Sequence, residues 1–243
     1  MNYVLEALAF IFDPANFGGP NGIAERFGEH LVYTVVSMLI ALAIALPLGL
    51  YIGHTGRGRN AVIAITSAAR AVPTFGLVLF VILFTGLGLW PLVFVLVVLA
   101  IPPVLAGVYS GLESVDRVTI DAARATGMSE WQILTRVEIP LGLPLIVGGV
   151  RAATLQVIAT ATIASYTGLG GLGQIITSGI GLNDYDRILG GALLVTALAL
   201  GVDAVFASAQ RLTATKGLTD TTRHATRRRT SSRSPRPPAR ENA

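Results

Sequence analysis

Cysteine is absent from this chain of 243 residues, and lysine occurs once, at position 216. Without cysteine there is no disulfide framework, thiolate metal site or thiol nucleophile, and three scattered histidines cannot build a zinc site alone. A nucleotide-binding P-loop needs Gly-Lys-Ser/Thr, because its lysine reaches the phosphates and its hydroxyl binds magnesium. Lys216 instead lies between Thr215 and Gly217. We therefore expect no catalysis, metal or cofactor in this chain.

Charge is also scarce, because only 13% of the residues are charged whereas 52% are hydrophobic. Soluble domains carry charge on about a quarter of their residues, so these proportions favour a membrane protein. The net charge of +4 hides a basic tail, since residues 211–243 hold nine Lys or Arg against two acidic residues. We expect this Arg-, Ser- and Pro-rich tail to be disordered and to contact anionic lipid rather than nucleic acid.

Long uncharged runs indicate how the part of the chain before the tail is organised. A membrane-crossing helix needs about 20 apolar residues, and residues 71–112 contain no charged side chain at all. Buried core helices of a soluble protein are the alternative, but a run of that length disfavours it. The sequence therefore predicts an all-α transmembrane fold with five spans: 31–52, two within 71–112 separated by a turn at 85–91, 141–166, and 188–208.

The distribution of Lys and Arg predicts the orientation of these spans. The segment before residue 31 has four acidic residues and one arginine, which is the wrong sign for a signal peptide. One side of the membrane collects 14 basic residues and the other side 2, and cytoplasmic loops are the basic ones. We expect an extracytoplasmic segment 1–30, a membrane domain 31–209 and a cytoplasmic tail 210–243.

The polar segment 113–140 has the pattern of two short helices facing the cytoplasm. Asp116 can cap the first helix, and Gly127 stands where a left-handed residue would end it. Ser129-Glu-Trp-Gln132 has the spacing of a capping box for the second helix, and Pro140 is expected to end that helix. Such a helix pair is typical of a docking element.

This segment resembles a known family motif. Asp121-Ala-Ala-x-x-x-Gly127, nine residues and then Val137-x-Ile139-Pro140 is similar to the EAA loop of membrane subunits of binding-protein-dependent ABC importers. That pattern has Glu, Ile and Leu where this chain has Asp121, Val137 and Ile139. The resemblance implies a coupling helix that sits in a cleft of a separate ATPase subunit. The residues it implies are Asp121, Ala122, Ala123, Gly127, Val137, Ile139 and Pro140.

The resemblance covers about residues 28 to 210 and is greatest to the osmoprotectant branch, which carries glycine betaine, choline, carnitine and related betaines. It is carried by Arg70-Ala-Val-Pro-Thr74, Gly148-Gly-Val-Arg151 and Tyr166-Thr-Gly-Leu-Gly-Gly-Leu-Gly173. The last two strings recur in methionine and other type I permeases, so an amino-acid permease stays the alternative. A passive channel would not need the docking loop, and we find no constellation for a membrane enzyme.

The resemblance implies the permease fold of type I ABC importers in the cytoplasmic (inner) membrane. The chain has neither a nucleotide site nor a large outer domain, so its expected partners are an ATPase and an extracytoplasmic solute-binding protein. Five helices alone are not enough to line a pathway for a solute. A second permease subunit, identical or related, is therefore also expected.

Two further features fall within or beside the spans. Arg151 and Asp203 can form a structural ion pair between the fourth and fifth spans, or Arg151 can reach the inner headgroups instead. Four glycines predict a tight re-entrant turn at the external mouth, not a dinucleotide fingerprint, because they follow a span rather than a strand. These glycines are Gly168, Gly170, Gly171 and Gly173. Gly107-x-x-x-Gly111 indicates close helix packing.

Overall fold

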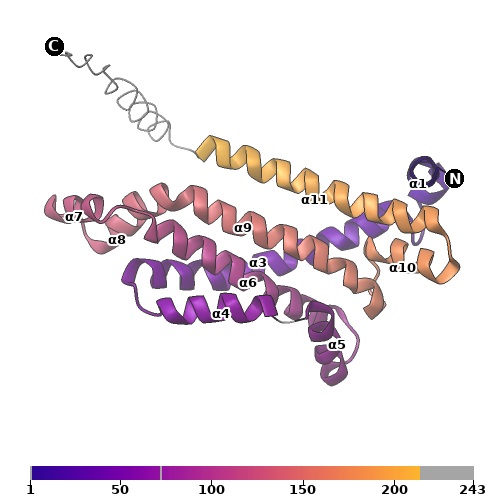
Figure 1. Ribbon diagram of the computed structural model, residues 1–243, viewed down its shortest axis with the longest axis horizontal. Coiled ribbons are helices and arrows are strands. Elements are labelled where there is room, and N and C mark those ends of the chain that lie inside the picture. The colour runs from indigo at the N-terminus through magenta and orange to yellow at the C-terminus, as the bar shows by residue number, and fades with distance from the viewer. Residues whose placement is uncertain (1, 72, 214–243) are drawn as a thin grey trace, which may run out of the picture.

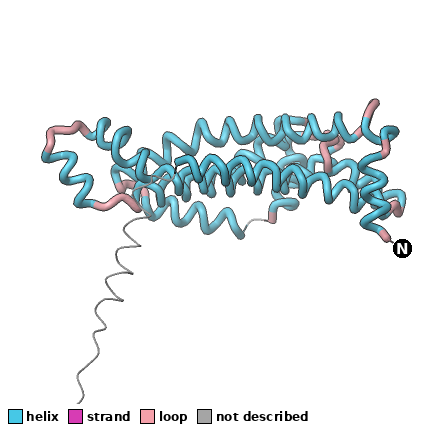
Figure 2. Tube along the Cα trace, turned by 90° about the horizontal axis from the view of Figure 1, so that it is seen from above, coloured by secondary structure: helices cyan, strands magenta, loops and turns pink. Residues whose placement is uncertain are grey.

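A computed structural model describes residues 2–71 and 73–213, and its regular elements there are helices, the longest of which run along one long axis (Figures 1 and 2). The N-terminal part comprises α1 (Tyr3–Phe12), α2 (Pro14–Phe17), α3 (Ile23–Thr55), α4 (Arg59–Ala71) and α5 (Thr74–Thr85). The central part comprises α6 (Leu89–Glu113), α7 (Arg117–Ala125), α8 (Glu130–Ile133), a π-helical turn (Leu134–Glu138) and α9 (Ile139–Ala161). A 3-10 segment (Thr162–Thr167), α10 (Gly173–Leu182) and α11 (Tyr185–Thr213) follow. The predicted tail lies outside the described residues from position 214 on.

Four helical segments are long and apolar enough to cross a membrane: Ile23–Thr55, Leu89–Glu113, Glu130–Thr167 and Tyr185–Gln210. The predicted second span, 71–84, corresponds to α5 apart from residue 71, which ends α4. Pro73 has no backbone N–H and disfavours helix at the residue before it, so a new helix begins at Thr74. The 12 residues of α5 reach only about 18 Å. Both α4 and α5 pack on α6, and neither is among the four long apolar segments.

Pro140 does not end a helix, which corrects our expectation. The helix that opens at Glu130 continues through the π-helical turn into α9, and Pro140 is in the first turn of α9. The amide of Ile139 donates to the carbonyl of Leu134, five residues earlier, and this wider turn accommodates a residue that lacks an N–H. The second helix of the docking segment and the membrane span therefore form one continuous rod of 38 residues, Glu130–Thr167.

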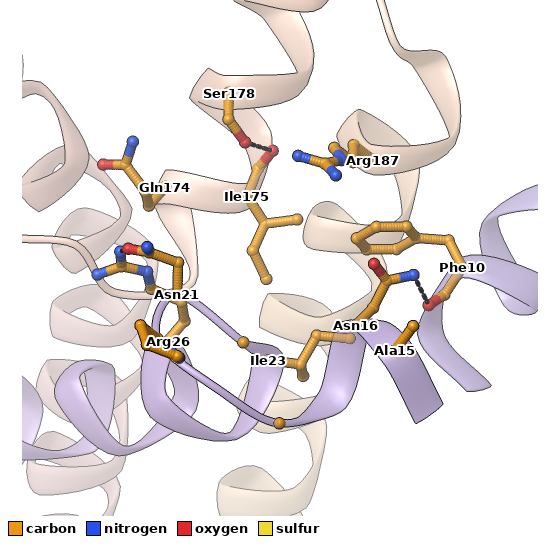
Figure 3. Close-up of a pocket in the computed structure, with 13 residues that line it drawn as sticks. Phe10, Ala15, Asn16, Asn21, Ile23, Arg26, Gln174, Ile175, Ser178 and Arg187 are labelled. Carbon is orange, nitrogen blue, oxygen red and sulfur yellow. Dashed lines mark hydrogen bonds between the residues drawn. The ribbon is translucent and has the colours of Figure 1, made fainter. Parts of the chain in front are cut away.

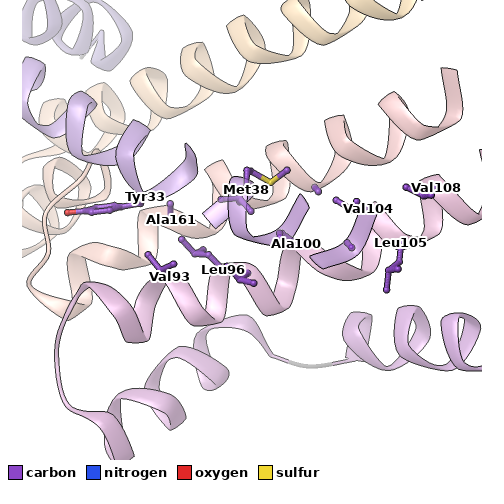
Figure 4. Close-up of a cluster of buried hydrophobic side chains, with 14 of the residues drawn as sticks. Tyr33, Met38, Val93, Leu96, Ala100, Val104, Leu105, Val108 and Ala161 are labelled. Carbon is purple, nitrogen blue, oxygen red and sulfur yellow. The ribbon is translucent and has the colours of Figure 1, made fainter. Parts of the chain in front are cut away.

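The core lies where α3, α6 and α9 meet (Figure 4). The fully buried Leu96 and Leu105 of α6 face this junction. Glycines let α6 and α9 approach closely, because a β-carbon on Gly107 would come within 2.5 Å of the Gly149 Cα. One on Gly111 would lie 2.8 Å from a carbonyl oxygen of α9. This contact is the close packing that the Gly107-x-x-x-Gly111 spacing predicts.

Candidate functional site

The docking segment has the local geometry that its sequence predicts. The Asp116 side chain accepts a hydrogen bond from the Val118 amide at 2.9 Å and so caps α7. Gly127 follows α7 with φ at +86°, a left-handed conformation that favours glycine. A reciprocal capping box between Ser129 and Gln132 then opens α8. The two short helices are thus fixed by contacts within the segment.

A small apolar cluster holds α7 against α8. Its buried members are Val115, Ile120 and Ile133, with Met128 packed against them. Asp121 and Ala122 face solvent on the other side, Ala123 is half-buried, and Gly127 is exposed. Among the later motif residues Val137 and Ile139 are half-buried, and Pro140 is exposed. The first half of the motif is therefore accessible to a partner, whereas its second half partly packs within the bundle.

Two large apolar side chains are exposed on this segment, Val118 at 73% and Trp131 at 72%. Sequence reasoning did not single them out, although Trp131 is the third residue of the capping box. Exposed aromatic and aliphatic groups beside small residues such as Ala122 are typical of a protein-binding surface. They extend the candidate docking surface beyond the motif residues.

A series of ion pairs connects the docking segment to the end of α3. The Arg124 guanidinium contacts Glu130 at 2.8 Å and Asp121 at 3.3 Å, and its hydrogen bond to the Glu130 carboxylate raises the pKa of Arg124. His54 then reaches Glu130 through Nε2 at 3.3 Å and Glu138 through Nδ1 at 2.5 Å. No pattern along the chain indicated this contact, since 84 residues separate His54 from Glu138.

The structure brings Arg151 of α9 and Asp203 of α11 together. The guanidinium donates Nε to Oδ1 at 2.6 Å and Nη2 to Oδ2 at 2.7 Å, which is a bidentate pair. Its Nη1 also donates to the Gln210 side chain at 3.0 Å, and Gln210 donates to the Pro144 carbonyl at 3.1 Å. The charges of α9 and α11 are therefore matched within a hydrogen-bonded network.

The glycine turn connects the 3-10 segment to α10. Gly168, Gly170 and Gly171 have φ values of +73°, +83° and +73°, which side chains with a β-carbon rarely adopt. Gly173 begins α10 directly against the carbonyl of Thr162, where a β-carbon would not fit. The turn thus depends on glycine both for its backbone conformation and for its close approach to the preceding helix.

Polar side chains of α3 hold this turn. Glu29 accepts a hydrogen bond from the Gly171 amide at 2.8 Å and pairs with Arg26 at 2.8 Å. The Tyr33 hydroxyl donates to the Leu169 carbonyl, and the His30 ring contacts the Ile158 carbonyl at 3.0 Å. Sequence reasoning missed these residues, because the contacts join positions more than 120 residues apart.

Beside this cluster an open cavity of about 340 Å³ lies between α1–α3 and α10–α11 (Figure 3). Arg26 and Arg187 line it together with polar groups such as Gln174. Both arginines already have anionic partners, Glu29 and Asp184, and Arg187 also lies over the Phe10 ring. The charges of this cavity are therefore balanced from within the chain.

Comparisons with known proteins agree with this architecture. Residues 45–216 match the family described as binding-protein-dependent transport system inner membrane component. The chain is 38% identical to the carnitine transport permease protein OpuCB of Listeria monocytogenes, over 72% of this chain and 80% of that protein. It is 34% identical to the glycine betaine/carnitine/choline transport system permease protein OpuCB of Bacillus subtilis, over 79% and 89%.

A solved structure of the MetNI methionine ABC transporter in an inward-facing conformation is similar with a TM-score of 0.67 and 25% identity, over 77% of this chain and 94% of that one. The family match includes the docking segment, the glycine turn and both members of the Arg151–Asp203 pair. It begins at residue 45, so the polar side chains of α3 that hold the glycine turn lie before it.

Proposed function

The chain belongs to the family of binding-protein-dependent transport system inner membrane components, and we propose that it is the permease subunit of an importer for osmoprotectants. Glycine betaine, carnitine and choline are the proposed solutes, because two relatives, at 38% and 34% identity, are named as permeases for carnitine and for all three solutes, respectively. The similar methionine transporter is less alike in sequence, at 25% identity. This difference favours betaines and choline over an amino acid.

The proposal is supported chiefly by the exposed residues of the docking segment. This segment exposes Asp121, Ala122 and Val118 on α7 and Trp131 on α8. A separate ABC ATPase is the proposed partner for this surface, since the chain has no P-loop of its own. ATP and magnesium would then bind to that partner.

Two other partners follow from what the fold contains. Among the described residues, the end of the molecule near the N-terminus has α1, α2, the α5–α6 turn, the glycine turn and α10 outside the long spans (Figure 1). These elements are too small to enclose a solute, so an extracytoplasmic binding protein is proposed to deliver it. A second permease subunit, identical or related, would line the pathway together with this one.

The proposed orientation places the N-terminus outside and the tail in the cytoplasm of a cytoplasmic (inner) membrane protein. It is supported by the basic residues, which gather beside the docking segment and in the tail. It is also supported by the fold, because α7 and α8 lie at the opposite end from the N-terminus and α10 (Figure 1). Counting α4 and α5 as one broken crossing gives five crossings.

The proposed mechanism is mechanical and involves no covalent chemistry. When ATP binding closes the ATPase subunits, they pull on α7 and α8. Because α8, the π-helical turn and α9 form one rod, a displacement at the cytoplasmic end moves the span itself. The spans then exchange between inward and outward openings as the populations of two states shift.

Uptake of labelled solute tests the proposal. We expect deletion of the gene to abolish import of glycine betaine, carnitine or choline at high osmolarity, and the intact gene to restore it. Labelled methionine serves as the control solute, whose uptake should not change. Loss of methionine uptake with unchanged uptake of all three osmoprotectants would contradict the proposed solute class.

A further inference from the structure

His54 lies at the cytoplasmic end of α3 between two carboxylates of the docking segment. Its Nδ1 is 2.5 Å from Glu138 and its Nε2 is 3.3 Å from Glu130. We propose that His54 is a positioning residue that ties the docking segment to the first span, so that movement imposed by the ATPase reaches α3 as well as α9. This inference rests on the proposed function.

Burial explains why this contact is strong enough to act as a tie. The Glu138 side chain is only 5% exposed and that of His54 only 15%. A buried carboxylate is costly without a partner, and His54 supplies one. When both ring nitrogens carry protons, the imidazolium can donate to both carboxylates. Separating α3 from the π-helical turn would leave Glu138 buried and unpaired.

Further side-chain contacts connect His54 to the accessible half of the docking motif. Glu130 is held by Arg124, and Arg124 also contacts Asp121, the first residue of that motif. Polar side-chain contacts therefore connect the ATPase-facing helix α7 to the end of α3 without a gap. Beyond this series, Glu138 shares a small cavity with Arg59, Glu113 and Arg117, and Arg59 pairs with Glu113 at 3.2 Å.

This arrangement gives the docking segment two connections to the membrane helices. The first is covalent, through the π-helical turn into α9, and the second is the His54 contact with α3. Since α3 and α9 both pack against α6, moving them together would shift the bundle as a unit. Without His54, α7 and α8 could move while α3 stayed behind, and ATP hydrolysis would then be less tightly coupled to transport.

A distance measurement tests the tie without requiring transport. The chain lacks cysteine, so spin labels can be placed at Thr119→Cys on α7 and Tyr51→Cys on α3, both of which are exposed. In the complex with its ATPase, we expect a narrow distance distribution for the otherwise unchanged chain and a broader one with His54→Gln. Arg187→Gln, which removes an ion pair at the opposite end, is the control and should leave the distribution narrow.

The amount of solute imported per ATP hydrolysed tests whether His54 couples ATP hydrolysis to transport. In proteoliposomes, His54→Gln should retain the ATPase and its basal activity, whereas solute imported per ATP should fall roughly threefold to tenfold. The double variant His54→Gln/Glu138→Gln removes the buried charge and lets two amides bond, so part of the ratio should return. A purely structural role would lower the yield of protein but not this ratio.

An unchanged distance distribution in His54→Gln would overturn the tie. A broadened distribution with an unchanged ratio would overturn the coupling role. If the unaltered complex imports none of the osmoprotectants, the proposed function fails, but the distance measurement still decides whether His54 holds α7 to α3.

Discussion

At the scale of single residues, charge inside a membrane helix is costly unless it is paired. Arg151 and Asp203 meet in a bidentate geometry, at 2.6 and 2.7 Å, between two helices that are far apart in sequence. The pair fixes a register between α9 and α11, since the planar guanidinium matches a carboxylate in few orientations. We propose that its role is structural and that neither residue binds solute.

Removing the anionic partner tests this role. Asp203→Asn leaves the Arg151 cation without its counter-charge, so we expect a lower melting temperature for the purified protein, by several degrees. The double variant Arg151→Gln/Asp203→Asn removes both charges and should be less harmful than Asp203→Asn alone. Asp184→Asn is the control, because its ion pair with Arg187 lies at the very start of α11 rather than inside the span, and asparagine can also cap this helix. An unchanged melting temperature in Asp203→Asn would show that the pair is not needed.

At the scale of elements, the docking segment contains a glycine turn followed by a continuous helical rod. Gly127 allows the chain to reverse between α7 and α8, whereas α8, the π-helical turn and α9 continue without a break. Displacement of α8 therefore acts on the rod directly, and the angle between α7 and α8 depends on one left-handed residue.

A β-branched residue at position 127 tests that dependence. The left-handed conformation costs roughly 1–2 kcal/mol for residues with a β-carbon, so Gly127→Val should displace α8 and weaken co-purification of the ATPase. Gly127→Asn is the matched control, because asparagine tolerates this conformation, as Asn183 does at φ +57°. Membrane insertion should be normal in both variants. Equal ATPase recovery with valine and asparagine would contradict the assigned role of the turn.

At the scale of the whole molecule, the long helices separate two polar ends. One end carries α7, α8 and the His54 contacts, and the other carries the N-terminus, the glycine turn and α10 (Figures 1 and 2). The first end is rich in arginine, and α11 runs back toward it. We propose that this separation allows the ATPase and the binding protein to contact opposite ends of the subunit.

Labelling of single cysteines tests the proposed orientation. In spheroplasts, a membrane-impermeant maleimide should modify Leu182→Cys near the end of α10, because this exposed position is expected outside. Val118→Cys on α7 should react only after the membrane is permeabilised. The natural chain has no cysteine and therefore serves as the unlabelled negative control. Reaction of Val118→Cys in intact spheroplasts would reverse the orientation.

Local features of this protein could be predicted from its sequence, and features that depend on helix packing could not. The caps at Asp116 and Ser129 and the turn at Gly127 involve neighbours within a few residues, so their patterns are visible along the chain. Pro140 was misjudged because a π-helical turn accommodates it, and nothing in the local pattern distinguishes that turn from a helix end. The short length of α5, 12 residues, was missed because the uncharged run that begins at residue 71 suggested a full-length span.

The sequence by itself determined the all-helical membrane fold, the docking motif and the absence of a nucleotide site, because apolar run length, residue spacing and residue type do not depend on how helices pack. Only the tertiary structure decided that His54 meets Glu138 and that Glu29 holds Gly171. These contacts join positions 84 and 142 residues apart. They form because α3 spans the whole bundle and packs beside α9 at both ends, an arrangement fixed by close contacts among α3, α6 and α9.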